Sequence, residues 1–215
     1  MPDGTGHGVA LGPQRWQVPT GGPRPHVVLV GLMGSGKTTV GRKLARLVGA
    51  GFVDADVELE ARSGRSVAEW FADGEAAFRD AEAGLLVDVL AAPDPVVLGA
   101  GGGVVVRPEN RARLSEADVA VVYLHGEPAF LASRAQAKPH RPLLAEADPV
   151  EVFERLHAER DPWYREVADA TVEVRPAHEA GERPKWRLAE QVAEALVALG
   201  AVAPADVVDV EAVPR

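Results

Sequence analysis

The chain has no cysteine and no long apolar segment. Without cysteine, disulfide bonds and thiolate metal sites are excluded, and we expect a protein of the reducing cytoplasm. No run reaches the about 18 apolar residues of a membrane span, and residues 1–25 lack the apolar centre of a signal peptide. Basic residues are also scarce relative to acidic ones, and the net charge of -9 argues against a nucleic-acid-binding protein.

Apolar residues are plentiful by contrast, at 47% of the 215 residues, which is enough for a large core. The Gly- and Pro-rich residues 1–25 predict a flexible N-terminal tail, and residues 200–215 predict a C-terminal tail outside the core. Residues 26–199 would then form one domain.

Strand-like and helix-like segments alternate within that domain. Short apolar runs predict strands at 26–31, 51–57, 95–100, 118–126 and 170–174. Helical spacing predicts a helix after Lys37 and further helices at 67–72, 75–90, 149–160 and 186–199. This order indicates an α/β protein of three layers, α/β/α, with a five-stranded parallel sheet.

The sequence GLMGSGKTT, residues 31–39, matches the phosphate-binding pattern G-x-x-x-x-G-K-[ST]. Its glycines allow successive backbone N–H groups to surround a phosphate at the start of a helix. Lys37 would reach the β- and γ-phosphates, and the Thr38 hydroxyl would bind Mg²⁺. Because the pattern follows an apolar strand and precedes a helix, we prefer a nucleotide site to a glycine-rich turn with an exposed lysine.

Asp54 and Asp56 are two residues apart at the end of the second predicted strand, so both side chains should point to one side. Carboxyl ends of parallel strands line ligand crevices. One carboxylate could hold Mg²⁺ through water while the other accepts a hydroxyl proton. The alternative is a solvated pair of loop carboxylates.

Two arginines are candidates for binding an anionic acceptor. Arg79 has Glu82 one turn later, a spacing that on its own slightly favours an ordinary surface ion pair. Arg160 continues the apolar face formed by Phe153 and Leu156, where a charge needs a partner. That partner could be an anionic ligand or a glutamate of the chain.

Residues 133–149 contain four basic side chains, prolines and little periodicity, which predicts a mobile kinase lid that closes over phosphate. A solvated basic loop is the alternative, and His140 is interpreted as a solvated residue of this loop. The three consecutive glycines 101–103 follow a buried strand, where they indicate a close approach to the backbone.

The segments GLMGSGKTTVGRKLA, DAD, FRDAE, GAGGG, RPLL and RDPWYREVA occur in an order and with spacings that resemble the shikimate kinases. The resemblance spans residues 27 to about 176 and implies the nucleoside monophosphate kinase fold. It also implies ATP-dependent phosphorylation of the shikimate 3-hydroxyl in aromatic amino-acid biosynthesis, with one Mg²⁺ per subunit. We expect a monomer.

The resemblance implies a role for each residue that it matches. Asp56 would contact the reacting hydroxyl, and Asp54 would lie in the outer shell of Mg²⁺. Arg79 and Arg160 would hold the shikimate carboxylate, and Glu82 would orient Arg79. Shikimate would lie against Gly101, Gly102 and Gly103, with the Gly102 N–H donating to a ring hydroxyl.

On the nucleotide side, Arg141 in RPLL would be the lid arginine on the transferred phosphate. Arg134 would stack on adenine, and Arg175 would complete the base pocket, although the segment after Arg175 matches the family weakly. The expected ATP-binding residues are therefore Gly34, Ser35, Gly36, Lys37, Thr38, Thr39, Arg134, Arg141 and Arg175, with Lys37, Asp56 and Arg141 as the catalytic set.

Two other functions stay open at this point. The chain could be a kinase for another small hydroxylated acceptor, such as gluconate. It could also be a nucleotide-binding regulator without catalysis, although an intact Asp56 and a lid arginine argue against that.

Overall fold

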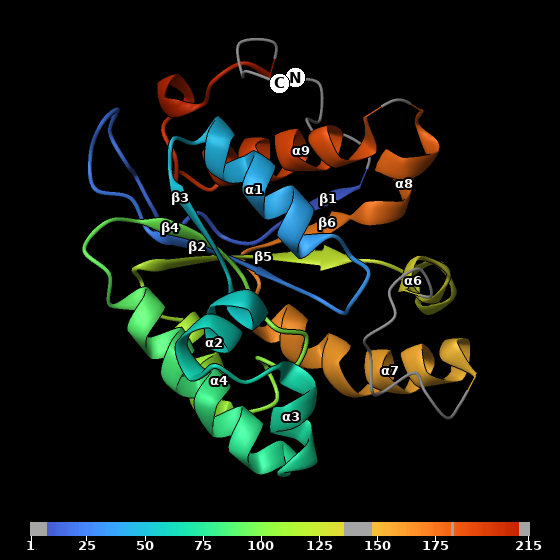
Figure 1. Ribbon diagram of the computed structural model, residues 1–215. Helices are drawn as coiled ribbons and strands as arrows, with labels where there is room; N and C mark the ends of the chain where they lie inside the picture. Colours follow the sequence, from blue (N-terminus) through green and yellow to red (C-terminus); the bar gives the residue numbers. More distant parts are fainter. Residues whose placement is uncertain (1–7, 136–147, 182, 211–215) are drawn as a thin grey trace.

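The computed structural model describes residues 8–135, 148–181 and 183–210, which form three layers around a central sheet (Figure 1). In these residues the sheet has six strands in the order β1-β6-β5-β2-β4-β3. Their bounds are β1 Val9–Leu11, β2 His26–Val30, β3 Gly51–Asp54, β4 Val96–Gly99, β5 Val119–His125 and β6 Ala170–Glu173. The five predicted strands are confirmed and run parallel, and β1 is a sixth strand that pairs antiparallel with β6.

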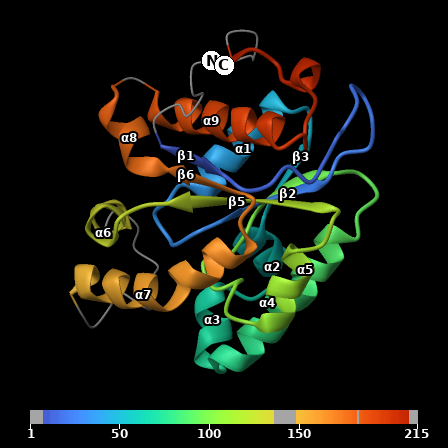
Figure 2. The ribbon, with the colours of Figure 1, turned by 180° about the vertical axis from the view of Figure 1, so that it is seen from behind.

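Helices cover both faces of the sheet (Figures 1 and 2). α1 and α9 pack on one face; α4, α5 and α7 pack on the other, with α2 and α3 against α4 and α6 beside α7. The bounds are α1 Lys37–Leu47, α2 Ala55–Ser63, α3 Val67–Ala72, α4 Glu75–Leu90, α5 Pro108–Leu114, α6 Pro128–Ala135, α7 Pro149–Val167, α8 Val174–Glu179 and α9 Pro184–Ala198. In the part of the chain described, no helix is both long and apolar enough to cross a membrane.

The core lies around β2 and β5, which are apolar along nearly their whole length because helices cover them on both faces. On α1, Val40, Leu44 and Leu47 are buried at the spacing that predicted this helix. Four helices were not predicted: α2, α5, α6 and α8. Each has only six to nine residues, and helices this short seldom show a clear apolar period, although the six-residue α3 was predicted.

The predicted N-terminal tail is in large part folded. β1 adds to the edge of the sheet beside β6, and the Gly12 N–H donates to the carbonyl of Asp169 at 2.6 Å. Trp16 is buried, and its indole Nε1–H donates to the Ala117 carbonyl at 2.7 Å. The prediction of a flexible segment over residues 1–25 is therefore wrong for residues 9–18, because their few apolar side chains have long-range partners that composition does not reveal.

The predicted C-terminal tail also packs on the domain. Ala201, Val202 and Ala203 are buried, and the Gly200 carbonyl accepts a hydrogen bond from Val18 N–H at 3.0 Å. A 3₁₀ helix follows at Pro204–Asp206, and Val208 N–H donates to the carbonyl of Leu47 at 2.8 Å. Residues 200–208 thus bond to the N-terminal segment at one end and to α1 at the other, and they do not form a tail outside the core.

Candidate active site

The phosphate-binding pattern forms the turn between β2 and α1. Gly34 and Gly36 have φ values of 84° and 101°, a left-handed region that favours glycine, and Gly36 is the N-cap of α1. The first N–H groups of α1 consequently face outward from the end of the sheet, where an anion is favoured by their partial positive charge. The ammonium of Lys37 lies along this turn and donates to the carbonyls of Gly31 and Leu32 at 2.7 and 3.0 Å.

A cavity of about 260 Å³ opens at this turn and collects most of the predicted phosphate-site residues. It is lined by Met33, Gly34, Gly36, Lys37, Thr38, Thr39, Asp54, Asp56, Gly99, Ala100, Gly102, Arg134 and Lys185. Ser35 is buried beneath the turn, and its hydroxyl has no hydrogen-bond partner within the described residues.

The two aspartates reach this cavity by a different route from the one predicted. β3 ends at Asp54, whose carboxylate caps α2 by accepting from Val57 N–H at 3.3 Å, and Asp56 lies in the first turn of that helix. The prediction of two side chains on one face of a strand is therefore wrong, because an N-cap ends the strand at the first aspartate. Both nevertheless line the cavity.

Asp54 and Thr38 offer oxygen atoms suited to a magnesium ion. The Thr38 hydroxyl donates to the Asp54 carboxylate at 2.6 Å, so the two groups from α1 and β3 already lie side by side. Mg²⁺ prefers hard oxygen ligands and keeps several waters. A hydroxyl and a carboxylate at the mouth of a phosphate turn fit that ion.

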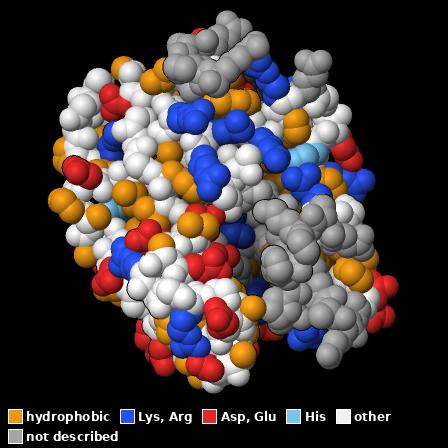
Figure 3. Space-filling model, in the orientation of Figure 1, with side chains coloured by type: hydrophobic (Ala, Val, Ile, Leu, Met, Phe, Trp, Pro, Cys, Tyr) orange, Lys and Arg blue, Asp and Glu red, His pale blue; other side chains and the backbone are white. Residues whose placement is uncertain are grey.

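Positive charge gathers beside the cavity although the whole chain is acidic. Figure 3 shows Lys and Arg side chains over α1 and α9, next to the nucleotide side of the molecule. Lys43 has a pKa below its usual value, first because of burial and then because of Arg46, Lys185 and Arg183 nearby. This local field favours a polyphosphate ligand.

Arg79 and Glu82 form a buried ion pair on α4, not the surface pair that the spacing slightly favoured. Arg79 is only 6% exposed, and its guanidinium donates to Glu82 at 2.7 Å and to Glu75 at 3.0 Å. Burial raises the pKa of Glu82 against the opposing attraction of Arg79. For Arg79, burial lowers the pKa, but the attraction and hydrogen bond of Glu82 prevail and the pKa is raised.

The glycine triplet passes directly over this pair. A Cβ atom at Gly101 would lie 2.3 Å from a Glu82 carboxylate oxygen, and one at Gly103 would lie 2.0 Å from a guanidinium nitrogen of Arg79. At Gly102 a Cβ would meet nothing nearer than 3.7 Å. Two of the three glycines are thus explained by side chains of the protein itself, whereas a Cβ at Gly102 would lie at ordinary contact distance, 3.7 Å, from the backbone of Gly31 and Met33.

Arg160 comes to the same place from α7. One guanidinium N–H donates to the Gly102 carbonyl at 3.1 Å, and the Tyr164 hydroxyl donates to the same oxygen. The Nε of Arg160 is buried without a hydrogen bond in the described part of the chain, with Glu159 3.6 Å away. α7 extends to Val167 instead of ending at residue 160, which puts Arg160 and Tyr164 one turn apart on the same face.

The remaining predicted residues have different outcomes. Arg134 lines the cavity and donates to the Gly34 carbonyl at 3.1 Å. Arg175 is on the surface, where it pairs with Glu127 and Glu179 at 2.8 and 2.7 Å, and it does not line the cavity. Arg141 and His140 lie outside the described residues.

Lys185 and Tyr164 are among the residues of the site that were not predicted from the sequence. Lys185 lines the cavity from α9, and Tyr164 holds the Gly102 carbonyl. Tyr164 lies within the RDPWYREVA segment, which could have indicated it, whereas Lys185 follows a stretch with little resemblance to the family.

A larger hollow of about 730 Å³ lies elsewhere, between β1, α8 and α9. Val9, Leu11, Arg187, Gln191 and Glu194 are among the residues that line it. None of the predicted site residues that the structure describes lines it. The smaller cavity is therefore the candidate active site because of the residues that line it, although its volume is smaller.

Comparisons with known proteins agree with this geometry. A family model described as shikimate kinase matches residues 33–198. A shikimate kinase of Dechloromonas aromatica is 47% identical over 151 residues, which are 70% of this chain and 81% of that protein. One from Halorhodospira halophila is 45% identical over 161 residues, or 74% and 86% of the two chains. Among solved structures, shikimate kinase from Acinetobacter baumannii in complex with shikimate has a TM-score of 0.74 and 35% identity, and the match covers 81% of this chain and 94% of that one.

Proposed function

The chain belongs to the shikimate kinase family, and on that premise we propose that Asp56, Arg79, Glu82 and Arg160 form its acceptor site. The reaction transfers the γ-phosphoryl group of ATP to the 3-hydroxyl of shikimate and yields 3-phosphoshikimate and ADP, a step of aromatic amino-acid biosynthesis. The observation that carries the assignment is the convergence of the buried Arg79, Glu82 and Arg160 at Gly101–Gly103, with Asp56 beside them at the phosphate cavity.

Arg79 and Arg160 would bind the carboxylate of shikimate by charge-assisted hydrogen bonds. Glu82 and Glu75 hold the Arg79 guanidinium from one side, and the Gly102 carbonyl holds Arg160. Both arginines are therefore oriented in advance, which reduces the entropy lost when the substrate binds.

Asp56 would accept the proton of the 3-hydroxyl as that oxygen attacks the γ-phosphorus. The bond from the γ-phosphorus to the β–γ bridging oxygen breaks, and ADP leaves with that oxygen. Because the transition state is loose, Asp56 would mainly orient the hydroxyl. Its place at the border of the phosphate cavity and the glycine triplet supports this role.

Lys37 and the N–H groups at the start of α1 would stabilise charge on the phosphate oxygens during transfer. Thr38 and Asp54 would hold Mg²⁺, in part through water, and the bound ion would supply further neutralisation of the β- and γ-phosphates. Arg134 would contact the adenine side. The ion pairs of Arg175 with Glu127 and Glu179 do not support its predicted adenine role, and Arg141 stays a sequence-based prediction for the lid.

A coupled assay of ADP release tests the function. Rapid ADP formation is expected with ATP, Mg²⁺ and shikimate together, and only background release with gluconate or with no acceptor. Equal rates with gluconate would contradict the acceptor assignment.

The two aspartates provide a matched pair for the proposed roles. Asp56→Asn should lower kcat by about 100-fold or more at saturating Mg²⁺, with ATP affinity nearly unchanged. Asp54→Asn should instead raise the Mg²⁺ concentration needed for half-maximal rate. Wild-type turnover in Asp56→Asn would mean that another group orients the hydroxyl.

A further inference from the structure

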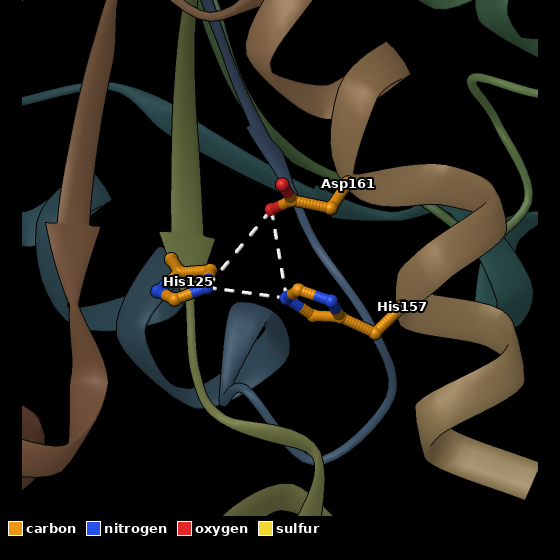
Figure 4. A group of neighbouring side chains, drawn as sticks. All are labelled: His125, His157 and Asp161. Carbon is orange, nitrogen blue, oxygen red and sulfur yellow. Dashed lines mark hydrogen bonds and ion pairs between the residues drawn. The ribbon is translucent and has the colours of Figure 1, made fainter.

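Three potential metal ligands meet at the end of β5, apart from the residues proposed for catalysis. His125 is the last residue of β5, while His157 and Asp161 lie one turn apart on α7 (Figure 4). Among the described residues, this is the group of three whose ligand atoms all lie within 4.8 Å of one another. Each side chain is partly exposed, at 13%, 24% and 17%, so water can reach the group.

The distances between the three facing atoms suit a small metal ion better than they suit hydrogen bonds. The two histidine Nε2 atoms are 3.2 Å apart, and they lie 3.9 and 3.6 Å from the same oxygen of Asp161. Only the shortest of these contacts is a hydrogen bond. Three polar atoms therefore face one point with a single hydrogen bond among them, and the Asp161 oxygen also accepts from the Tyr123 hydroxyl at 2.9 Å.

The two histidine Nε2 atoms and the Asp161 oxygen form a triangle whose size matches the coordination sphere of zinc. Atoms with these separations lie on a circle with a radius of about 2.1 Å, the length of a Zn–N or Zn–O bond. In tetrahedral zinc sites the ligand atoms are about 3.3–3.4 Å apart, so shifts of a few tenths of an ångström complete the geometry.

Neighbouring groups already orient the ligands. Nδ1 of His125 lies 2.7 Å from the Glu173 carboxylate, so Nε2 is the ring nitrogen directed at the centre of the triangle. Tyr123 donates at 2.9 Å to Oδ1 of Asp161, the oxygen that faces the two histidines, and Arg165 donates at 2.7 Å to Oδ2. A carboxylate behind a histidine ligand is a recurrent feature of zinc sites.

We propose that His125, His157 and Asp161 bind one divalent transition-metal ion with the preferences of Zn²⁺, with water as the fourth ligand. Two imidazoles select against Mg²⁺, which takes oxygen ligands, so the site differs in chemistry from Thr38 and Asp54. The ion would fasten α7, which carries Arg160, to the end of β5.

The test uses the full chain, stripped with a chelator and free of nucleotide, with Co²⁺ as a spectroscopic probe and Zn²⁺ as its competitor. We expect one Co²⁺ per chain with the intense visible absorption of tetrahedral sites, displaced by one equivalent of Zn²⁺ and unaffected by excess Mg²⁺. Zn²⁺ at about 100 times its Kd should raise Tm by about 5–10 °C.

The variants separate this site from adventitious binding. His157→Gln should weaken Co²⁺ binding by about 100-fold or more, and Glu173→Gln by about 10–100-fold. His178→Gln on α8 is the histidine control and should bind like wild type. If His157→Gln does not fold, Asp161→Asn replaces it. Absence of the tetrahedral spectrum, or equal affinity in wild type and the ligand variants, would overturn the proposal whatever the kinase activity is.

Discussion

The three glycines at 101–103 are identical in the sequence, but each is close to a different group in the structure. The guanidinium of Arg79 occupies the space beside Gly103, and a carboxylate oxygen of Glu82 occupies the space beside Gly101. The Gly102 carbonyl accepts a hydrogen bond from Arg160, and a Cβ at Gly102 would meet no atom nearer than 3.7 Å. Substitutions at the three positions should consequently impair the protein for different reasons.

Gly103→Ala should displace Arg79 and raise the KM for shikimate by about 10-fold or more, because a charge-assisted hydrogen bond is lost. Gly102→Ala should keep the wild-type Tm within about 2 °C, since its Cβ meets no atom nearer than 3.7 Å, yet weaken shikimate binding. Thermal melts with shikimate and ATP titrations measure both effects. An unchanged shikimate Kd in Gly102→Ala would mean that the substrate does not contact this glycine.

Arg160 should contribute to substrate binding in the ground state and in the transition state alike, because the Gly102 carbonyl holds it in place. Arg160→Ala should therefore raise the KM for shikimate by about 10- to 100-fold, with a smaller change in kcat. Arg155→Ala, at an exposed position on the same helix, is the control. Steady-state kinetics measure both constants. A decrease in kcat with an unchanged KM would mean that Arg160 stabilises only the transition state.

At the scale of elements, β2 carries the phosphate turn at one end and a buried histidine at the other. His26 is 6% exposed, and its Nδ1 accepts the Val96 N–H at 3.3 Å, which links β2 to β4. Burial lowers the pKa of His26 below 6.5 despite the attraction of Asp118. The folded state thus prefers the neutral ring.

This preference predicts a pH dependence of stability. A base with a lowered pKa stabilises the fold fully above its unfolded pKa of about 6.5, and that contribution is lost as the pH falls through the folded value. Between about pH 7.5 and about pH 5.5, wild type should lose more free energy of unfolding than His26→Gln, whose amide does not titrate. Urea denaturation at both pH values gives the comparison. Parallel losses in the two proteins would show that His26 does not titrate in this range.

For the whole molecule, the N-terminal segment closes one edge of the sheet and joins it to the C-terminal segment. Arg15 pairs with the buried Asp169 at 2.8 Å, Trp16 packs into the core, and Val18 bonds to the Gly200 carbonyl. None of these residues touches the phosphate cavity. Stability and catalysis should therefore respond separately to changes here.

Trp16→Ala should cost about 3–5 kcal/mol of unfolding free energy and lower Tm by about 6–15 °C, because it empties a core position and removes the indole hydrogen bond. At temperatures where both proteins are folded, kcat should match wild type. Leu11→Ala, at a side chain that is about half exposed, should change Tm by only about 1–2 °C. A wild-type Tm in Trp16→Ala would show that the segment adds nothing to the core.

The sequence by itself determined the parallel sheet, the phosphate turn and the family, because each can be identified from patterns along the chain: the alternation of strands and helices, one continuous turn, and motifs in a set order. A glycine-rich turn before Lys37 and Thr38 can form wherever a strand leads into a helix. The same reasoning was wrong about Asp56 and about residues 9–18, where an N-cap and a distant strand decide the conformation. Only the tertiary structure decided that Arg79 lies over Gly103 and that His125 faces His157, since these contacts join segments far apart in the chain. Their formation depends on how the helices pack on the sheet, and no local pattern of residues encodes that packing.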